Sequence, residues 1–281
     1  MFAVGIYGGL ASQMNQYAFL RILKRKFPDV EVKMAVASDW RRYMEHNGYE
    51  LDRVFGIEHD SIDWKTLRRL ANFYPWHGWF AKVMNGLYQL RDRIVGPKPT
   101  HITFPVLKHA DWTVFDRLDP AKDYLLWSNY AMDYFDEDEL RSIFVFRPPL
   151  EGRNAELMDE IRGCESVSIH VRRGDYLKYG FPLMPVSYYR QAVERIRKSV
   201  VASRFFVFSN DPDWVDANFD FLPEKTVVRG NLGIRSYVDL QLMSACRHNI
   251  LANSGYSLFA AWLNANPSKK IISPEDIPCC Q

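Results

Sequence analysis

The chain has 281 residues, of which 47% are hydrophobic, 15% aromatic and 25% charged, a composition typical of a globular protein with room for two domains. Its net charge of +2 argues against a nucleic-acid-binding protein, which normally carries a strong basic excess. No apolar run approaches the ~20 residues of a membrane span, and the start of the chain lacks the basic region of a signal peptide, so we expect a cytoplasmic protein with at most peripheral membrane association.

The chain opens with a pattern that predicts strand, loop, helix and strand, over residues 2–7, 8–13, 14–26 and 30–36. This is the opening of a doubly wound α/β domain. The third glycine of a dinucleotide fingerprint is absent, so NAD binding is only weakly indicated. The glycine loop can bring backbone N–H groups near a ligand at a helix N-terminus, and its candidate substrate-binding residues are Gly9, Ser12 and Gln13. A tight turn selected only for packing is the alternative.

Residues 40–120 are harder to interpret, because short helical patterns over 61–72 and 80–93 alternate with aromatic clusters such as Tyr74–Phe80. They form either a helical insertion with its own small core or a lining for an acceptor sugar. A helix over 136–144 follows. Pro148-Pro149 is then the best candidate linker, which predicts an N-terminal domain over 1–150 and a C-terminal domain over 151–281.

The second half alternates regularly between strands and helices, which predicts a second α/β unit with a parallel sheet. Ser187 is the expected N-cap of one helix, and Ser236 begins a capping-box-like start to another. Cys164 and Cys246 lie in apolar contexts and are expected to be reduced core thiols. The predicted elements are helices over 154–162, 187–200, 236–246 and 258–264 and strands over 166–171, 205–209 and 249–252.

Two arginines, a glycine and an aspartate follow the strand 166–171 directly. Arginine is costly to order and to desolvate, so two side by side at a strand end indicate an anion to bind, and the planar fork suits phosphate best. Gly174 lets the backbone turn or approach a ligand closely. We interpret Arg172 and Arg173 as diphosphate-binding residues that neutralise charge on a departing diphosphate.

Polar residues mark three strand exits of this second unit, at 170–175, 209–213 and 253–257. The carboxyl ends of parallel strands lie on one edge of a sheet, and ligands bind there. Serines at a helix start also offer hydroxyls and free N–H groups to phosphate. The further candidate substrate-binding residues at this edge are His170, Ser209, Asp211, Asn253, Ser254 and Ser257.

Several of these residues have other interpretations. Arg173-Gly174-Asp175 spells an adhesion tripeptide, which would need an exposed extracellular loop. Asp211-Pro-Asp213 matches the DxD of metal-dependent nucleotide-sugar transferases, but Asp before Pro also opens turns. Because arginines are present to balance the diphosphate charge, we expect no metal and no other cofactor. His170 shares strand parity with Ser166 and Ser168, so a hydrogen-bonded structural histidine is equally expected.

Together these segments resemble the inverting alpha-1,2-fucosyltransferases of glycosyltransferase family 11. The family segment H-x-R-R-G-D-Y corresponds to His170–Tyr176, and Phe-Ser-x-Asp-x-x-Trp corresponds to Phe208–Trp214. The closing motif is similar to Asp239–Ser254, and the N-terminal glycine motif is similar to Gly8–Phe19. The matches occur in the family's order and span almost the whole chain.

The resemblance implies a GT-B fold, in which two Rossmann-like domains face each other across a cleft. It implies GDP-fucose as donor on the C-terminal side, a galactose-containing glycan as acceptor on the N-terminal side, inversion, and no metal. By the same analogy, Arg172 holds the pyrophosphate, and His170, Asn253 and Ser254 lie near GDP. Asp175 is our candidate catalytic base, since a carboxylate beside two arginines should be ionised; a salt bridge that fixes the arginines is the alternative.

The chain also departs from the family pattern. Ala11 and Ser12 replace the usual Gly-Asn, and Leu258-Phe-Ala260 replaces Trp-Trp-Gly. The family's Gly-Tyr-Trp-Gln-Ser-Glu-Lys-Tyr-Phe is matched only weakly by Trp127–Phe135. These changes bear on the acceptor and the donor sugar more than on the fold or the nucleotide. They leave two alternatives, a metal-dependent transferase that uses the DxD and a non-catalytic GDP-sugar-binding protein.

Overall fold

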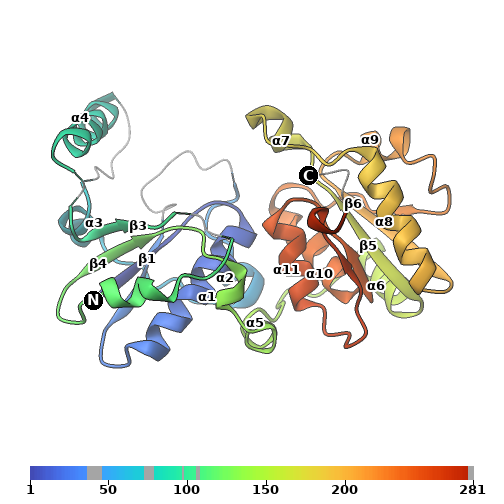
Figure 1. Ribbon diagram of the computed structural model, residues 1–281, viewed down its shortest axis with the longest axis horizontal. Helices are drawn as coiled ribbons and strands as arrows, with labels where there is room; N and C mark the ends of the chain where they lie inside the picture. The colour runs from blue at the N-terminus through green and yellow to red at the C-terminus, as the bar shows by residue number, and fades with distance from the viewer. Residues whose placement is uncertain (37–45, 73–78, 97, 106–107, 278–281) are drawn as a thin grey trace. The chain divides into compact units, whose positions relative to one another are not determined.

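The chain folds into two compact units, Met1–Ile143 and Phe144–Gln281. The predicted boundary at residue 150 falls a few residues after this division. The aromatic cluster predicted over Tyr74–Phe80 lies outside the described residues except at its last two positions. The computed structural model describes residues 1–36, 46–72, 79–96, 98–105 and 108–277 (Figure 1).

The first unit is built on a parallel sheet with the strand order β2-β1-β4-β3. Every residue of β1 is buried, as expected for a strand covered on both faces. Gly5 is required there, because a Cβ would lie 2.1 Å from the Trp127 ring. β3 and β4 were not predicted from the sequence. The strands are β1 (Phe2–Ile6), β2 (Val32–Val36), β3 (His101–Thr103) and β4 (Tyr124–Trp127).

The first helix, α1, begins at Leu10, which corrects the prediction of a loop over 8–13. Gly9 is its N-cap, and the Gln13 N–H already donates to the Gly9 carbonyl over 3.1 Å. Only Tyr7, Gly8 and Gly9 therefore remain between β1 and α1. The helices of this unit are α1 (Leu10–Lys26), α2 (Leu51–Phe55), α3 (Trp64–Leu70), α4 (Trp79–Val95) and α5 (Glu137–Ile143), with 3-10 turns over Trp112–Arg117 and Met132–Tyr134.

The α3 region does not form the separate small core that was one interpretation of residues 40–120. Leu67 and Leu70 of α3 belong to the same buried cluster as Ala3, Ala35 and Leu125 of the sheet. α4 differs, because many of its apolar side chains are exposed. In Figure 1 it lies beyond α3 as seen from the sheet of the first unit.

The second unit contains a parallel sheet with the strand order β7-β6-β5-β8-β9, so the predicted parallel α/β unit is confirmed. Val171 at the end of β5 pairs with Ser209 at the end of β6, and Ile169 pairs with Ile250 at the end of β8. The three predicted strand exits therefore share one edge. The strands are β5 (Glu165–Val171), β6 (Ser203–Ser209), β7 (Thr226–Val227), β8 (His248–Ile250) and β9 (Ile271–Ile272).

Two of the exits continue into short helices rather than loops, α7 after β5 and α9 after β6. The predicted caps also differ: the N-cap of α8 is Pro185 instead of Ser187, and Ser236 precedes α10 without a side-chain capping bond. The helices are α6 (Arg153–Arg162), α7 (Gly174–Tyr179), α8 (Val186–Ser199), α9 (Pro212–Asn218), α10 (Tyr237–Ala245) and α11 (Gly255–Leu263), with 3-10 turns over Gly233–Arg235 and Pro274–Asp276.

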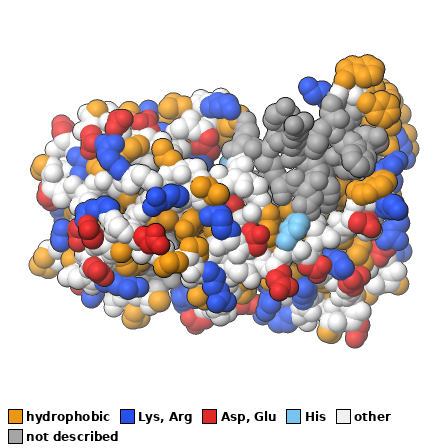
Figure 2. All heavy atoms as spheres, turned by 180° about the vertical axis from the view of Figure 1, so that it is seen from behind, with side chains coloured by type: hydrophobic (Ala, Val, Ile, Leu, Met, Phe, Trp, Pro, Cys, Tyr) orange, Lys and Arg blue, Asp and Glu red, His pale blue; other side chains and the backbone are white. Residues whose placement is uncertain are grey.

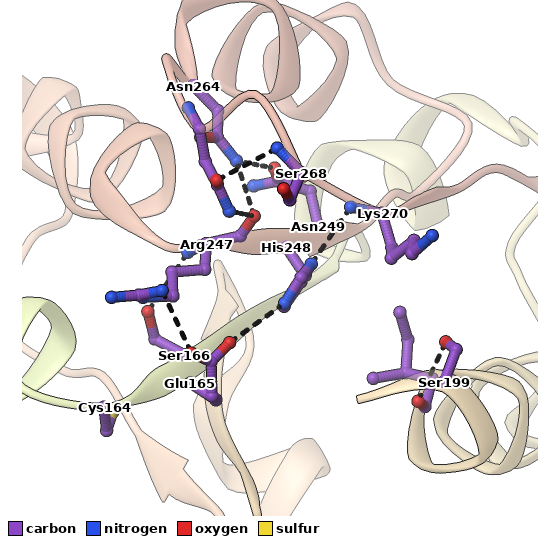
Figure 3. A network of polar contacts seen from close by, with 12 residues as sticks. Cys164, Glu165, Ser166, Ser199, Arg247, His248, Asn249, Asn264, Ser268 and Lys270 are labelled. Atoms are coloured by element: carbon purple, nitrogen blue, oxygen red, sulfur yellow. Dashed lines mark hydrogen bonds and ion pairs between the residues drawn. The ribbon is translucent and has the colours of Figure 1, made fainter. Parts of the chain in front are cut away.

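A polar network fixes the start of β8 between β5 and β9, at the edge opposite the strand exits (Figure 3). His248 Nε2 lies 3.4 Å from Glu165 Oε2, and its Nδ1 accepts from the Lys270 backbone N–H over 3.0 Å. Deeper in the sheet, the Asn249 amide donates to the Ser168 hydroxyl over 2.8 Å. Polar side chains at the N-terminal end of β5 thus bond to other residues of the chain. The candidate ligand-binding residues lie at the C-terminal end of the strand.

Cys246 is a buried free thiol and Cys164 a half-buried one, and neither forms a disulfide among the described residues. Burial raises the pKa of both thiols, so they remain protonated at neutral pH. Within the described ranges, none of the helices combines the length and apolar character needed to cross a bilayer.

Candidate active site

Arg172 follows the last residue of β5 with its guanidinium partly buried. Its Nη2 donates to Asp175 Oδ2 over 2.6 Å, and the guanidinium carbon lies 5.6 Å from the centre of the Tyr176 ring. The Nε–H is buried and has no hydrogen-bond partner among the described residues. Leaving a buried donor unpaired costs about 1–3 kcal/mol, so this atom marks a position for an acceptor oxygen from a ligand.

Arg173 is held by its own chain. Its Nε donates to Asp211 Oδ2 over 3.2 Å, its guanidinium lies 3.9 Å from the Trp214 ring centre, and only 16% of its side chain is exposed. The expected pair of phosphate-binding arginines is therefore divided. Arg172 keeps an unused donor, while Arg173 links the end of β5 to α9.

Asn210, which follows β6, connects this strand end to the segment that follows β5. Its Oδ1 accepts from the Arg173 backbone N–H over 2.9 Å, and its Nδ2 donates to Asp175 Oδ1 over 3.2 Å. Gly174 is needed beside it, because a Cβ there would lie 2.7 Å from Asn210 Nδ2. With one oxygen on Arg172 and the other on Asn210, the Asp175 carboxylate forms the salt bridge that was the alternative to a catalytic base. Asn210 was not identified from the sequence, although it directly follows a predicted strand.

His170, on the same strand, is buried beside Arg172. Burial, and then the charge of Arg172, lower the pKa of this imidazole to about 3, so it is neutral at physiological pH. Its Nδ1 has no hydrogen-bond partner among the described residues, and its ring lies 5.6 Å from that of Tyr256 in α11. The histidine therefore offers a ligand one hydrogen bond and no charge.

The β8 exit lies against the same segment. The Tyr176 hydroxyl donates to the Asn253 carbonyl over 2.9 Å, which ties α7 to this exit. The Asn253 Nδ2 donates to the Pro182 carbonyl over 2.7 Å, but its Oδ1 is buried without a partner among the described residues. Arg172, His170 and Asn253 thus each have one unsatisfied polar atom, and they come from two adjacent strands of one sheet.

The hydroxyls of three serines predicted to bind substrate form hydrogen bonds within the chain. The Ser209 hydroxyl donates to the Val171 carbonyl over 2.8 Å, which closes the β5–β6 pair. Ser254 caps α11 by accepting from the Tyr256 N–H over 3.3 Å, as its position at a helix start predicts. Ser257 is only 1% exposed and accepts from the Ala252 N–H over 3.2 Å. Their phosphate contacts stay predictions, and within the chain Ser209 and Ser257 bond to the backbone while Ser254 caps α11.

The two carboxylates of the DxD segment each form an ion pair with a different arginine. Asp211 caps α9 by accepting from the Trp214 N–H and also pairs with Arg173. Asp213 is highly exposed and pairs with Arg229 over 2.7 Å. No cluster of three or more His, Cys, Asp or Glu side chains suited to a metal occurs among the described residues. The two aspartates therefore match the turn interpretation, here as a helix start.

Asp239 is a partly buried acid that sequence reasoning did not assign to the site. Burial raises its pKa to about 7, and the one bond that opposes this shift comes from Asn231 Nδ2 over 2.8 Å. The next residue, Leu240, donates its N–H to the Tyr256 hydroxyl over 3.0 Å. Asp239 is the first residue of the motif Asp239–Ser254 that resembles the family, and this position was the only indication of its importance in the sequence.

The predicted residues of the first unit gather at the end of β1. Gly8 has a φ of +78°, which favours glycine, and a Cβ on Gly9 would lie 3.3 Å from His46 Nδ1. Ser12 lies in the first turn of α1 and is half-buried. Gln13 is buried and spans the loop instead: its amide donates to the Gly8 and Gly48 carbonyls over 2.9 and 2.7 Å and accepts from the Glu50 N–H. Within the chain Gln13 thus ties the turn to residues 48–50, and its substrate contact stays a prediction.

A family model for "Glycosyl transferase family 11" matches residues 121–277, which include β4 and nearly all of the second unit. The chain belongs to glycosyl transferase family 11. The resemblance inferred from the motifs is thereby confirmed, and this chain is a glycosyltransferase by family.

Relatives of this family 11 chain include two proteins of Escherichia coli. The O-antigen biosynthesis glycosyltransferase WbnK is 26% identical over 95% of this chain and 91% of its own length. An alpha-1,2-colitosyltransferase is 27% identical over 91% of this chain and 85% of its own. The galactoside alpha-(1,2)-fucosyltransferase 1 of Ateles belzebuth is 32% identical over 91% of this chain and 63% of its own.

Solved structures agree on the fold. The NodZ alpha-1,6-fucosyltransferase soaked with GDP-fucose aligns over 93% of this chain and 91% of its own, with a TM-score of 0.55 and 14% identity. The fucosyltransferase NodZ from Bradyrhizobium aligns over 92% and 91%, with a TM-score of 0.54 and 14% identity. The expected α/β fold of GT-B type is therefore confirmed.

Proposed function

We propose that this chain transfers L-fucose from GDP-fucose to a galactoside hydroxyl, forming an alpha-1,2 linkage with inversion. Family membership and the names of the relatives support the reaction class. One structural observation carries the donor assignment: the buried, unpaired Nε–H of Arg172 at the end of β5. Unpaired atoms of His170 and Asn253 lie on the same and the adjacent strand exit, as expected for a diphosphate and its nucleoside.

In the reaction we propose, the acceptor oxygen attacks the anomeric carbon of fucose from the face opposite GDP. A carbon–oxygen bond to the acceptor forms while the bond to the β-phosphate oxygen breaks, and the hydroxyl proton leaves to a base or to solvent. Negative charge grows on the departing GDP, and a guanidinium aimed at it stabilises the transition state more than the ground state. Arg172 supplies that group, held in position by Asp175.

The acceptor and the sugar end of the donor belong, in this proposal, to the first unit. Gly9 and Ser12 lie where β1 meets α1, a position at which backbone N–H groups are available to ligands. Ala11 and Ser12 depart from the family's usual Gly-Asn, so this turn is where we place sugar selectivity.

We further propose that the transfer needs no metal ion. The support is the use of both DxD carboxylates by the chain, Asp211 as a helix cap paired with Arg173 and Asp213 as a partner of Arg229. A metal-dependent transferase would require both carboxylates to leave these partners and converge. The arginine supplies the positive charge that a divalent cation supplies in such enzymes.

One second candidate is supported by a specific relative, the alpha-1,2-colitosyltransferase of Escherichia coli. Colitose is fucose without its 3-hydroxyl, so the two donors differ by one polar group near the sugar-facing turn. The test is an array of galactoside acceptors incubated with GDP-fucose, GDP-colitose and GDP-mannose, with product linkage read by NMR. Fucosyl transfer to the 2-position supports the first proposal, and transfer only from GDP-colitose supports the second. GDP binding without any transfer would leave a sugar-nucleotide-binding protein and refute both.

A further inference from the structure

Helix α4 (Trp79–Val95) carries an apolar stripe on its exposed side. Its members recur every three or four residues, the spacing that places side chains on one face of a helix. Trp79 is 77% exposed, Leu87 and Leu90 are each 54% exposed, and Ile94 is 74% exposed. A contiguous exposed patch of this kind marks an interaction site rather than ordinary surface variation. The α4 stripe comprises Trp79, Phe80, Val83, Leu87, Leu90 and Ile94.

The opposite side of α4 faces the rest of the first unit. Asp92 accepts a hydrogen bond from Asn72, which follows α3, and Tyr88 lines a hollow shared with α3. At roughly 100° per residue, both positions fall on the side of the helix away from the α4 stripe. The stripe is therefore directed outward. Figure 2 shows hydrophobic side chains gathered at the upper right, where α4 lies, with Lys and Arg side chains beside them.

Basic residues border the α4 stripe. On the same helical wheel, Lys82 and Arg93 fall along one flank and Arg91 along the other, while Asp92, the acid of this helix, falls on the opposite face. Tryptophan and phenylalanine at one end of the stripe and lysine and arginine at its margins are the features of a helix that lies in a lipid–water interface. Long basic side chains can also extend their charges past an apolar layer toward headgroups.

The hollow between α3 and α4 extends the positive charge. It has a volume of about 450 Å³ and is lined by basic side chains of α3, including Lys65 and Arg68, and by Lys98. Lys98 Nζ donates to the Arg68 and Arg69 carbonyls over 2.7 and 3.1 Å. Burial, and then the charges of Arg91 and Arg68, lower the pKa of Lys98.

We propose that α4 is an interfacial helix that docks the first unit on an anionic phospholipid surface, with the stripe among the acyl chains and the basic margins at the headgroups. A second copy of this chain would fit the stripe less well. Whether two α4 helices packed parallel or antiparallel, Lys82 and Arg93 would face Arg91 or each other, and like charges would meet along the seam. The charges instead complement anionic lipid.

The test is co-sedimentation of the full chain with vesicles of phosphatidylcholine containing about one third phosphatidylglycerol, beside vesicles of phosphatidylcholine alone. The wild type should bind the anionic vesicles and lose binding as salt is raised. Leu87→Glu with Leu90→Glu should weaken binding by about tenfold or more, through the lost apolar burial. Replacing Lys82, Arg91 and Arg93 with Gln should weaken it by about fivefold for each charge removed.

The matched control is Val201→Glu, which places the same charge on an 86% exposed apolar side chain of the second unit and should not change binding. Circular dichroism should give the same spectrum for every variant. Failure of the wild type to bind anionic vesicles, or equal losses in the Val201 control, would overturn the proposal. A dimer in sedimentation equilibrium that the Leu87/Leu90 variant dissociates, without vesicle binding by the wild type, would assign the stripe to a second copy.

Discussion

Arg172 and Arg173 are neighbours of identical chemistry, and the structure gives them different tasks, so replacing them separately tests the proposed mechanism. Arg172→Ala removes the unpaired Nε–H and the bond to Asp175. Arg173→Ala removes the bond to Asp211 and the contact with the Trp214 ring. The first change should act on the rate of transfer and the second mainly on stability.

The magnitudes separate the two outcomes. A donor aimed at developing charge contributes about 10²–10³ in kcat, or ~2.7–4 kcal/mol. The side chains of the Arg172–Asp175 pair are 24% and 32% exposed, so solvent screens it, and its loss should cost at most ~1 kcal/mol. That corresponds to a fall in Tm of about 2–4 °C for a domain of this size. Arg172→Lys keeps the charge without the fork and should fall between Ala and wild type in rate.

The assay combines three measurements: kcat with GDP-fucose and the best acceptor of the array, GDP affinity by calorimetry, and Tm by scanning calorimetry. Both arginines have an ion pair and a cation–π contact, but Arg173 is the more buried and lies 3.9 Å from its ring centre, against 5.6 Å for Arg172. The Tm of Arg173→Ala should therefore fall further than that of Arg172→Ala, while its kcat falls less. A near-wild-type kcat in a folded Arg172→Ala protein would refute the leaving-group role. Equal rate losses in the two variants would refute the division of labour between them.

Four further predictions concern other residues of the second unit. Gly174→Ala should displace Asn210 from its bonds to Arg173 and Asp175, because the new Cβ would lie 2.7 Å from Asn210 Nδ2; GDP affinity, measured by calorimetry, should fall while circular dichroism stays unchanged. A chelator should leave initial transfer rates unchanged, and so should Asp213→Asn; loss of activity in both would favour a DxD metal site. His170 has a pKa of about 3 in the folded chain against 6.5 in the unfolded chain, so the free energy of unfolding falls as pH drops through that interval. His170→Gln should reduce this fall by up to ~1.4 kcal/mol per pH unit, measured by urea titration. The pKa of Asp239 is raised from 3.8 to about 7, so between these values the folded chain keeps a proton that the unfolded chain loses, and stability is lost as pH rises. Asp239→Asn should remove that loss. Unchanged pH profiles in the His170 and Asp239 variants would contradict the two assignments.

The sheet edge that carries the site was predictable because its signal is local. β5 and β6 are long enough to show their apolar character, and polar residues follow each of them directly. Parallel pairing then brings the two exits together without further information. β7 and β9 have two residues each, and β3 has three, which is too short for any period to appear. Their pairing with long neighbours, not their own sequence, makes them strands.

The start of α9 carried a signal that was interpreted too narrowly. Asp before Pro opens turns, but Asp at the N-cap followed by Pro at the first helical position also begins helices, and the structure has the second arrangement at Asp211-Pro212. α8 shows the converse, since Ser187 is a good capping residue but the helix already begins at Val186 after Pro185. Capping residues indicate that a helix begins nearby, whereas tertiary packing fixes the residue at which it begins.

The bonds that the serines form within the chain could not be predicted, for a different reason. A hydroxyl at a strand end is chemically able to bind phosphate, and the sequence does not show which backbone groups nearby lack partners. Ser209 and Ser257 satisfy such groups at Val171 and Ala252, and that demand exists only once the β5–β6 pair and the β8–α11 turn have formed. Among the described residues the same accounting leaves unpaired atoms on Arg172, His170 and Asn253 at this sheet edge, and on Tyr130 and Gln241 elsewhere.

Strand parity, taken one step further, would have separated the two arginines. Successive residues of an extended chain point to opposite sides, so Arg172 shares its side with His170, and Arg173 shares its side with Val171. In the structure, the charge of Arg172 acts on the His170 imidazole, while Arg173 lies on Trp214 of α9. We therefore expect Arg172 to face the ligand, whereas Arg173 contacts the scaffold. If Arg172 and Arg173 exchanged roles, the residues that now contact Arg173, Asp211 and Trp214, would have to lie on the other face of β5.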